Sequence, residues 1–253
     1  MKDAELHRVR DTHQSLYEKY SSSLFMILNI PHFSKIQEAY ERMSYCYKYW
    51  YSKFLPRHKD SKILDIGCGM GHFIYFLKKM GYTNYLGIDI SPEQVAFVKK
   101  FITDKVLLID ASTFLNNLEN EYDVIVMNDV LEHIPKSDII NFLSLVRKAL
   151  KDDGIVFIKT VNAANPFNFR GRYIDFTHEI AFTEHSLVQV LKIAGFRVIA
   201  LFGDECPRPG LKGTLDRFAK KIFFLIMRKL FQLQEINPPN ILDKNIIAIA
   251  SKA

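Results

Sequence analysis

The sequence contains few cysteines and no long hydrophobic run. Of its 253 residues three are cysteines, and Cys46, Cys68 and Cys206 lie too far apart for a zinc or iron–sulfur motif. A sparse, odd-numbered set is typical of proteins from a reducing compartment. The longest apolar run, residues 222–227, is far shorter than the roughly 18 residues that span a membrane. The sequence therefore predicts neither a cysteine-bound metal centre nor a membrane-spanning helix.

The N-terminal residues 1–10 are charged and lack the apolar core of a signal peptide. Hydrophobic residues make up 48% of the chain, which is enough for a substantial core. The length suits one large domain with appendages. We therefore expect a soluble, cytoplasmic protein.

Positive charge is concentrated in one segment. The chain carries a net charge of +6, and residues 207–235 contain seven basic and two acidic side chains, which leaves about +1 for the remainder. Charge that is confined to one segment is weak evidence for nucleic-acid binding, and no nucleic-acid-binding module is recognisable. We expect no nucleic-acid partner.

From residue 61 onward, strand and helix patterns alternate. The predicted strands are residues 62–66, 85–90, 106–109, 122–128, 155–160, 196–202 and 246–250. Repeated strand–helix units predict a parallel sheet with helices on both faces. Only a hairpin-like insertion separates the last two strands, so we expect the seventh to lie antiparallel beside the sixth. The sequence thus predicts an α/β domain over residues 61–253 with a seven-stranded, mostly parallel sheet.

Local signals mark several turns and helix ends of this domain. Ser91-Pro92-Glu93-Gln94 has the residues of a capping box, with serine at the N-cap and proline at the first helical position. Asp152-Asp153-Gly154 predicts a turn before the fifth strand.

Residues 1–60 are predicted to form a helical cap. Apolar side chains recur at helical spacing over residues 16–27, Pro31 interrupts the pattern, and residues 33–54 are rich in aromatics. One interpretation is a cap that packs against the main sheet. The other is that this cap also covers a bound cofactor or substrate.

A glycine-rich turn follows the first predicted strand directly. Gly67, Gly69 and Gly71 lie between this strand and a helix. Glycine has no Cβ, so the backbone of such a turn can approach a ligand closely, and the helix N-terminus attracts anions. The third glycine is four residues after the first, whereas the nicotinamide-type fingerprint places it five residues after.

The next three strands end in polar residues. Asp89 ends the second strand, 22 residues after Gly67, close to the spacing of an acidic residue that binds ribose hydroxyls. Asp110 follows the third strand, and the fourth strand ends in Asn128 and Asp129. Because the carboxyl ends of parallel strands meet at one edge of the sheet, we expect these residues to surround one ligand.

Together these motifs resemble the class I S-adenosylmethionine (SAM)-dependent methyltransferases. The resemblance covers residues 60–202 and the last strand, and it rests on residues 63–71, 87–91, 110–111 and 128–134. It implies a Rossmann-like fold, SAM as the cofactor and S-adenosylhomocysteine as the product.

The resemblance also implies cofactor-binding roles. Gly67 and Gly69, with Gly71 as the third loop position, would line the methionine and ribose. Asp65 would orient the loop or the amino group, and Asp89 would accept from both ribose hydroxyls. The remaining positions would be Ile90 against the adenine, Asp110 and Ala111 at the adenine amine, and Asn128 at the methionine end.

Two histidines are candidate general bases, because an alcohol acceptor must lose its proton. His133 follows the fourth strand, and His178 lies in the segment 165–182. A structural role is the alternative for each.

The segment 165–182 contains five aromatics and shows no clean periodicity. It is typical of a substrate lid, although an ordinary connection is the alternative. Its candidate substrate-binding residues are Arg170, Arg172, Tyr173 and Asp175.

Asp129, Glu132 and His133 form a pattern that holds a divalent ion in some proteins of the family. Hard cations prefer more oxygen ligands than this set supplies. We therefore predict no metal.

The insertion 207–240 contains a predicted amphipathic helix over residues 211–233. Its apolar stripe is Leu215, Phe218, Ile222, Ile226, Leu230 and Leu233, and basic residues lie opposite. Phe224 lies on the basic side and is predicted to be exposed. The helix either packs on the surface or in a homodimer, or it contacts an anionic membrane or a phosphorylated substrate.

The sequence defines the acceptor of the methyl group less well than the cofactor. An Asn/Asp-Pro-Pro-aromatic motif, expected of DNA N-methyltransferases, is missing after the fourth strand. The layout resembles small methyltransferases of bacterial polysaccharide pathways, which implies O-methylation of a sugar, nucleotide-linked or in a surface glycan. Arg170 and Arg172 would then hold a phosphate or carboxylate. The alternatives are another small metabolite, such as a quinone precursor or an amine, and a SAM-binding protein without catalysis.

Overall fold

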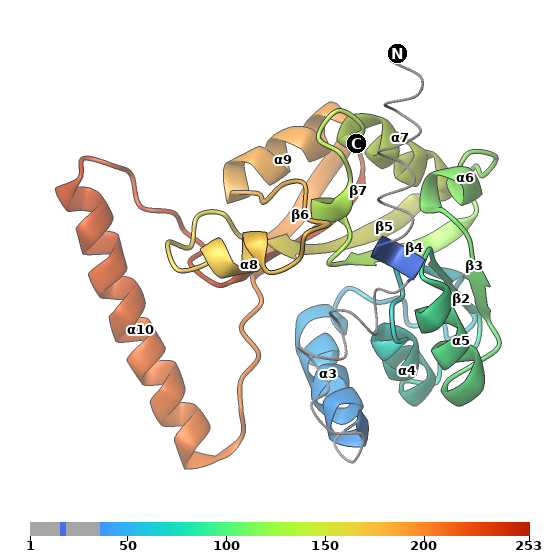
Figure 1. Cartoon of the computed structure of the whole chain (residues 1–253), viewed down its shortest axis with the longest axis horizontal. Helices are drawn as coiled ribbons and strands as arrows, with labels where there is room; N and C mark the ends of the chain where they lie inside the picture. The colour runs from blue at the N-terminus through green and yellow to red at the C-terminus, as the bar shows by residue number, and fades with distance from the viewer. Residues whose placement is uncertain (1–15, 19–35) are drawn as a thin grey trace.

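A computed structural model describes residues 16–18 and 36–253, and Figure 1 shows their arrangement around a seven-stranded sheet. The strand order is β3-β2-β1-β4-β5-β7-β6. The strands are β1 Ile63–Ile66, β2 Tyr85–Asp89, β3 Val106–Leu108, β4 Tyr122–Asn128, β5 Leu150–Val161, β6 Phe196–Gly203 and β7 Asn245–Lys252. The helices are α3 Ile36–Tyr51, α4 His72–Lys79, α5 Pro92–Phe101, α6 Ala111–Leu115, η3 Leu131–His133, α7 Ile139–Ala149, α8 Phe169–Tyr173, α9 Glu184–Ile193 and α10 Gly210–Leu233.

The predicted fold class is confirmed. Strands β1 to β5 pair in parallel, and β7 lies antiparallel between β5 and β6. Because the order reverses between β1 and β4, the carboxyl ends of these two strands border the crevice in which doubly wound sheets bind ligands.

Helices cover both faces of the sheet, with α7 and α9 on one face and α3, α4 and α5 on the other (Figure 1). Alternate residues of β4 pack against the helices on opposite faces of the sheet. Ile125 and Met127 pack in the cluster that contains α7 and α9, while Val124 and Val126 pack in the cluster that contains α3 and α4. The whole of β1 is buried, as expected of a central parallel strand.

Two local predictions are wrong. The turn predicted at residues 152–154 lies within β5, which already pairs with β4 at Leu150, and the register shifts between Tyr122 and Val124. A Cβ at Gly154 would lie 3.0 Å from the Tyr122 carbonyl oxygen, so glycine permits this irregularity.

The capping box predicted at Ser91 does not form. Ser91 is the N-cap residue of α5, but its side chain makes no capping bond. Its backbone amide instead donates to Asp89 Oδ1 at 2.8 Å. Asp89 therefore fixes the start of this helix.

Helix α3 forms the described part of the N-terminal cap. Tyr47, Trp50 and Tyr51 are buried against the body, and α3 packs beside α4. Of the predicted stripe at residues 16–27, only residues 16–18 lie within the described parts of the chain, where they form a helical turn.

The structure joins Cys46 of α3 to Cys206, just after β6, in a disulfide. The two residues are 160 positions apart in the sequence, so their spacing gave no sign of the pairing. Cys68 is buried with a free thiol. The inference of a reducing compartment from sparse, unpaired cysteines therefore loses its basis.

Helix α10 is inserted between β6 and β7 and projects from the main body (Figure 1). Phe224, predicted to be exposed, is half-buried, with its ring near Phe223 and under the Lys220 ammonium. In the described parts of the chain, none of the helices has the length and apolar character needed to cross a membrane.

Candidate active site

A cavity of about 970 Å³ opens at the carboxyl ends of β1, β2 and β4. The predicted cofactor residues that line it are Asp65, Gly67, Gly69, Asp89, Ile90, Asp110, Ala111 and Asn128. Residues of several further segments complete the wall, among them Tyr17, His133 and His178. Tyr17 and Asn245, which are 228 positions apart in the sequence, are thus brought to one site.

The glycine loop owes its shape to two left-handed residues. Gly67 and Gly69 have φ values of 63° and 54°, a region that other residues rarely adopt. A Cβ at Gly67 would also lie 2.6 Å from Val130 Cγ2. The loop backbone consequently packs closely against the residues that follow β4.

Gly71 has a different role from the one predicted. It does not line the cavity, but stands at the N-cap of α4 with a φ of 78°. A Cβ there would lie 3.1 Å from Val98 Cγ2 of α5. The absence of a side chain at Gly71 therefore allows α4 and α5 to pack closely together.

Asp89 ties the glycine loop to β2. Its Oδ2 accepts from the Gly69 amide and its Oδ1 from the Ser91 amide, both at 2.8 Å. Burial raises the pKa of this carboxyl group, and the amides that donate to it act in the opposite direction. The carboxylate is therefore held rigidly at the edge of the cavity, with lone pairs left to accept from a ligand.

Three buried polar atoms beside the cavity have no hydrogen-bond partner among the residues that the structure describes. They are Asp65 Oδ2, Ser91 Oγ and Asn128 Nδ2, and their three residues line the cavity. A buried polar atom without a partner is costly, so it points to a ligand or a water molecule. Burial and the neighbouring Asp89 raise the pKa of Asp65 well above its usual value, and a cationic ligand would offset this.

These features fit the SAM expected from the resemblance. The ammonium and sulfonium groups of SAM suit Asp65, and its ribose hydroxyls can donate to Asp89. Asp110 fits less simply, because its Oδ1 already accepts from the Thr113 amide and hydroxyl of α6 at 2.8 and 3.0 Å.

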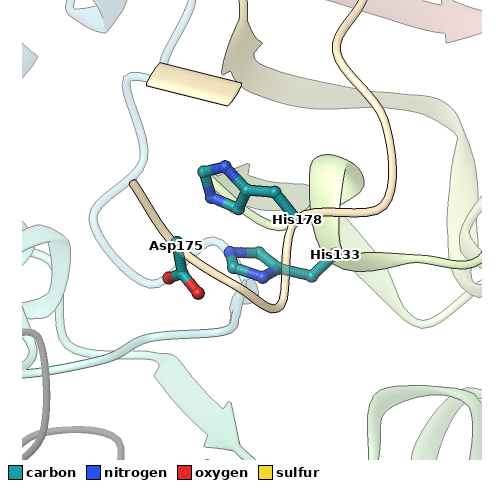
Figure 2. A group of neighbouring side chains, drawn as sticks. All are labelled: His133, Asp175 and His178. Atoms are coloured by element: carbon teal, nitrogen blue, oxygen red, sulfur yellow. The ribbon is translucent and has the colours of Figure 1, made fainter. Parts of the chain in front are cut away.

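His133 and His178 approach each other from different elements, with ring centroids 4.7 Å apart (Figure 2). His133 Nδ1 lies 2.8 Å from Thr177 Oγ1, and that hydroxyl donates to Asp175 Oδ1 at 2.6 Å. Because the single hydroxyl proton goes to Asp175, we assign the proton of the neutral imidazole to Nδ1. The lone pair then lies on Nε2.

The environment keeps His133 neutral. Burial and the neighbouring His178 lower its pKa to about 4, against the opposing effect of Asp175 and Asp129. A neutral imidazole is the protonation state that can accept a proton. His178 donates its Nδ1 proton to the Gly171 carbonyl at 2.9 Å, so the fold also fixes its tautomer.

The same residues form a donor set for a metal. In the described residues, ligand atoms of His133, Asp175 and His178 lie within 4.8 Å of one another (Figure 2). The set considered from the sequence does not assemble, because Asp129 pairs with Lys159 and the buried Glu132 accepts from Thr160 at 2.9 Å.

The candidate substrate residues of the lid separate into two groups. Arg170 and Asp175 line the cavity, whereas Arg172 and Tyr173 do not. The Arg172 guanidinium donates to the carbonyls of His178 and Glu179, and Tyr173 is 72% exposed. Arg172 therefore connects two parts of the lid and lies outside the cavity wall.

Sequence reasoning missed the role of Thr177. Its hydroxyl and amide both bind the carboxylate of Asp175, two residues earlier. This Asp-x-Thr spacing is the local signal that could have indicated an Asx-type turn. The contact with His133, by contrast, depends on the tertiary fold.

The sheet order, the glycine loop and the acidic end of β2 define a class I SAM-dependent methyltransferase. The chain belongs to the family described as "Methyltransferase domain", whose model matches residues 39–201. Its fold and family are thus those of the SAM-dependent methyltransferases.

Relatives and solved structures agree with this class. The chain is 32% identical over 110 residues to the ubiquinone biosynthesis O-methyltransferase of Actinobacillus pleuropneumoniae serotype 7, covering 40% of the chain and 46% of the relative. It thus spans about half the length of the curated relatives it matches. A SAM-dependent methyltransferase from Archaeoglobus fulgidus superposes with a TM-score of 0.64 at 22% identity, covering 84% of this chain and 94% of that one.

A second solved structure has a TM-score of 0.66 at 12% identity and covers 93% of this chain and 97% of its own. It is a complex of the Haloferax volcanii Trm112 methyltransferase activator with the putative methyltransferase. At such low identities these two structures support the fold alone.

Replacing Asp89 with alanine should weaken SAM binding by about 2–3 kcal/mol, because charge-assisted hydrogen bonds to ribose are lost together with the anchor of the glycine loop. Isothermal titration calorimetry with SAM measures this loss. Asp104→Ala, which removes an exposed aspartate outside the cavity, is the matched control. Wild-type affinity in Asp89→Ala would place the ribose site elsewhere.

Proposed function

We propose that the enzyme methylates a hydroxyl oxygen of its acceptor and that His133 is the general base. The observation that carries this proposal is the hydrogen-bonded series Asp175–Thr177–His133 at the cavity wall. It orients the imidazole so that Nε2 can accept a proton, as a buried aspartate does for the histidine of hydrolase triads. In this protein the Thr177 hydroxyl lies between the Asp175 carboxylate and the His133 imidazole.

When bound, SAM supplies a methyl group on a positively charged sulfur. The cavity wall would position the acceptor oxygen beside that methyl group, and much of the acceleration would come from this positioning. As the acceptor oxygen is methylated, its proton would pass to His133 Nε2. Asp175, through Thr177, stabilises the resulting imidazolium, and His178 helps to position the acceptor.

For the acceptor we propose a sugar, either nucleotide-linked or in a glycan. A second cavity of about 1080 Å³ lies between α3 and α10 and shares Tyr47, His72, Asp129, Lys244 and Asn245 with the first. Its wall includes Arg42, Arg208 and Arg217 together with carboxylates, among them Glu38, Asp204 and Asp216. Guanidinium and ammonium groups suit a phosphate or carboxylate on the acceptor.

A phenolic quinone precursor is the second candidate. The relatives named ubiquinone biosynthesis O-methyltransferase support it. So does the lowered pKa of His133, because a weak base removes a phenolic proton more readily than the proton of a sugar hydroxyl.

The release of S-adenosylhomocysteine with a panel of acceptors tests these proposals. We expect turnover with one or more nucleotide-linked sugars. Turnover with quinol precursors alone would establish the second candidate, and turnover with amines alone would contradict O-methylation. SAM binding with no product from any acceptor, lipid-linked and polymeric glycans included, would indicate a SAM-binding protein without catalysis.

A further inference from the structure

Helix α10 has two apolar faces, and only one of them packs against the protein. Gly213 and Met227 are buried, and Phe224 and Phe231 are half-buried. The opposite face carries Leu211, Leu215, Phe218, Ile222, Ile226 and Leu233, which are 44–78% exposed. The stripe predicted from the sequence is therefore the face that points away from the body.

This outward face is a continuous apolar surface. A helix of 24 residues is about 36 Å long at 1.5 Å per residue, and the exposed side chains recur along nearly its whole length. Single exposed leucines are ordinary on protein surfaces. An apolar stripe of this length marks a place where another molecule binds.

Contacts on the inner side hold the helix in place. Lys220 forms an ion pair with Asp243, and Arg228 donates to the Asn240 carbonyl at 2.9 Å. The rings of Phe167 and Phe223 lie 5.4 Å apart. The outward face is thus presented by an anchored helix.

The charge of α10 identifies the partner. The helix contains six basic residues and one acidic residue, Asp216. Arg217 and Lys221 lie one helical turn apart along one flank of the apolar stripe, and Lys229 lies near its centre. An apolar face bordered by cations is typical of helices that lie in the interface of an anionic bilayer.

A second copy of the chain fits this face poorly. A two-fold symmetric dimer through α10 would bring the same surface of both subunits together. Cations would then face cations, with a single aspartate on each helix to offset them, and like charges in contact are destabilising.

We propose that α10 docks on an anionic lipid surface, with its apolar stripe inserted at the headgroup boundary and its cations against lipid phosphates. This goes beyond methyl transfer and does not depend on the identity of the acceptor. Arg217 and Lys220 of α10 also line the second cavity, so docking would hold that cavity close to the membrane, with α10 between the two.

Co-sedimentation of the full chain with vesicles tests this surface. We expect binding to vesicles of phosphatidylcholine and phosphatidylglycerol, weak binding to phosphatidylcholine alone, and a loss of affinity as salt rises. Phe218→Asp, or Lys221→Glu with Lys229→Glu, should lower the affinity at least about tenfold, since each interfacial cation contributes on the order of 1 kcal/mol.

Matched controls come from α5. Phe101→Asp replaces a phenylalanine that is 58% exposed, against 64% for Phe218, and Lys99→Glu with Lys100→Glu replaces two exposed lysines. These variants should bind vesicles as the wild type does, and unchanged SAM affinity would show that every variant is folded.

Two results would overturn the proposal. One is an absence of binding to anionic vesicles, or a loss of vesicle affinity in the α5 control variants equal to the loss in the α10 variants. The other is a lipid-independent dimer, seen by light scattering, that Phe218→Asp converts to a monomer, because the outward face would then belong to a second copy.

Discussion

Replacing His133 with alanine should lower kcat by roughly 10²–10⁴-fold, the range expected for loss of a general base. The affinity for SAM should stay unchanged. The proton acceptor disappears, while Asp65, Asp89 and the glycine loop keep their contacts. Steady-state kinetics with an acceptor found by the product-release panel, together with calorimetry for SAM, measures the two effects separately. His178→Ala should lower kcat less, because His178 positions the acceptor.

Two further variants make this test specific. Thr177→Val keeps the shape of the side chain but breaks the link between Asp175 and His133, so it should lower kcat with little change in SAM affinity. His185→Ala removes a histidine of α9 that is 89% exposed and should leave kcat unchanged. Small, equal effects of His133→Ala and His178→Ala would remove the basis for assigning a histidine base.

Loss of the disulfide should lower the free energy of unfolding by about 2–4 kcal/mol, the range typical of native disulfides. The bond closes a long loop, because 160 positions separate Cys46 from Cys206, and cross-links of long loops restrict the unfolded chain strongly. Urea unfolding of the Cys46→Ala/Cys206→Ala variant, compared with the wild type, measures the difference.

Reductant provides the control for the disulfide. Dithiothreitol should destabilise the wild type to the level of the double variant and have no effect on the variant itself. SAM binding should also weaken after reduction, because Tyr51 of α3 donates to Asn128 Oδ1 at 2.6 Å beside the cavity. An unfolding midpoint that reductant does not change would contradict the stabilising role.

Buried ionisable side chains near the histidines have shifted pKa values. Glu132 is buried, and burial together with Asp129 raises its pKa to about 8. The neighbouring Lys159 is also buried, and its ion pair with Asp129 raises its pKa above the usual value. Asp129, Glu132 and Lys159 thus form a polar network at the cavity wall, in which electrostatic interactions are stronger than in water.

The sequence by itself determined the class of the fold and most of the predicted cofactor residues that the structure places around one cavity. Buried strands, helix periodicity and glycines with left-handed φ are encoded over a few residues, so local reasoning finds them. Gly67 and Gly69 follow β1, Asp89 and Asn128 end β2 and β4, and parallel strands bring their carboxyl ends to one edge. The antiparallel pairing of β7 with β6 followed from the insertion between them, in which the sequence predicts no further strand.

Only the tertiary structure decided which distant side chains meet. The disulfide joins residues on different elements, Thr177 links Asp175 to a histidine 44 positions earlier, and Arg172 turns to the carbonyls of its own lid. A residue's type shows what it can bind, but its partner is set by packing across the whole chain. For the same reason the sequence showed that α10 is amphipathic, whereas the fold decided that its main apolar stripe faces outward.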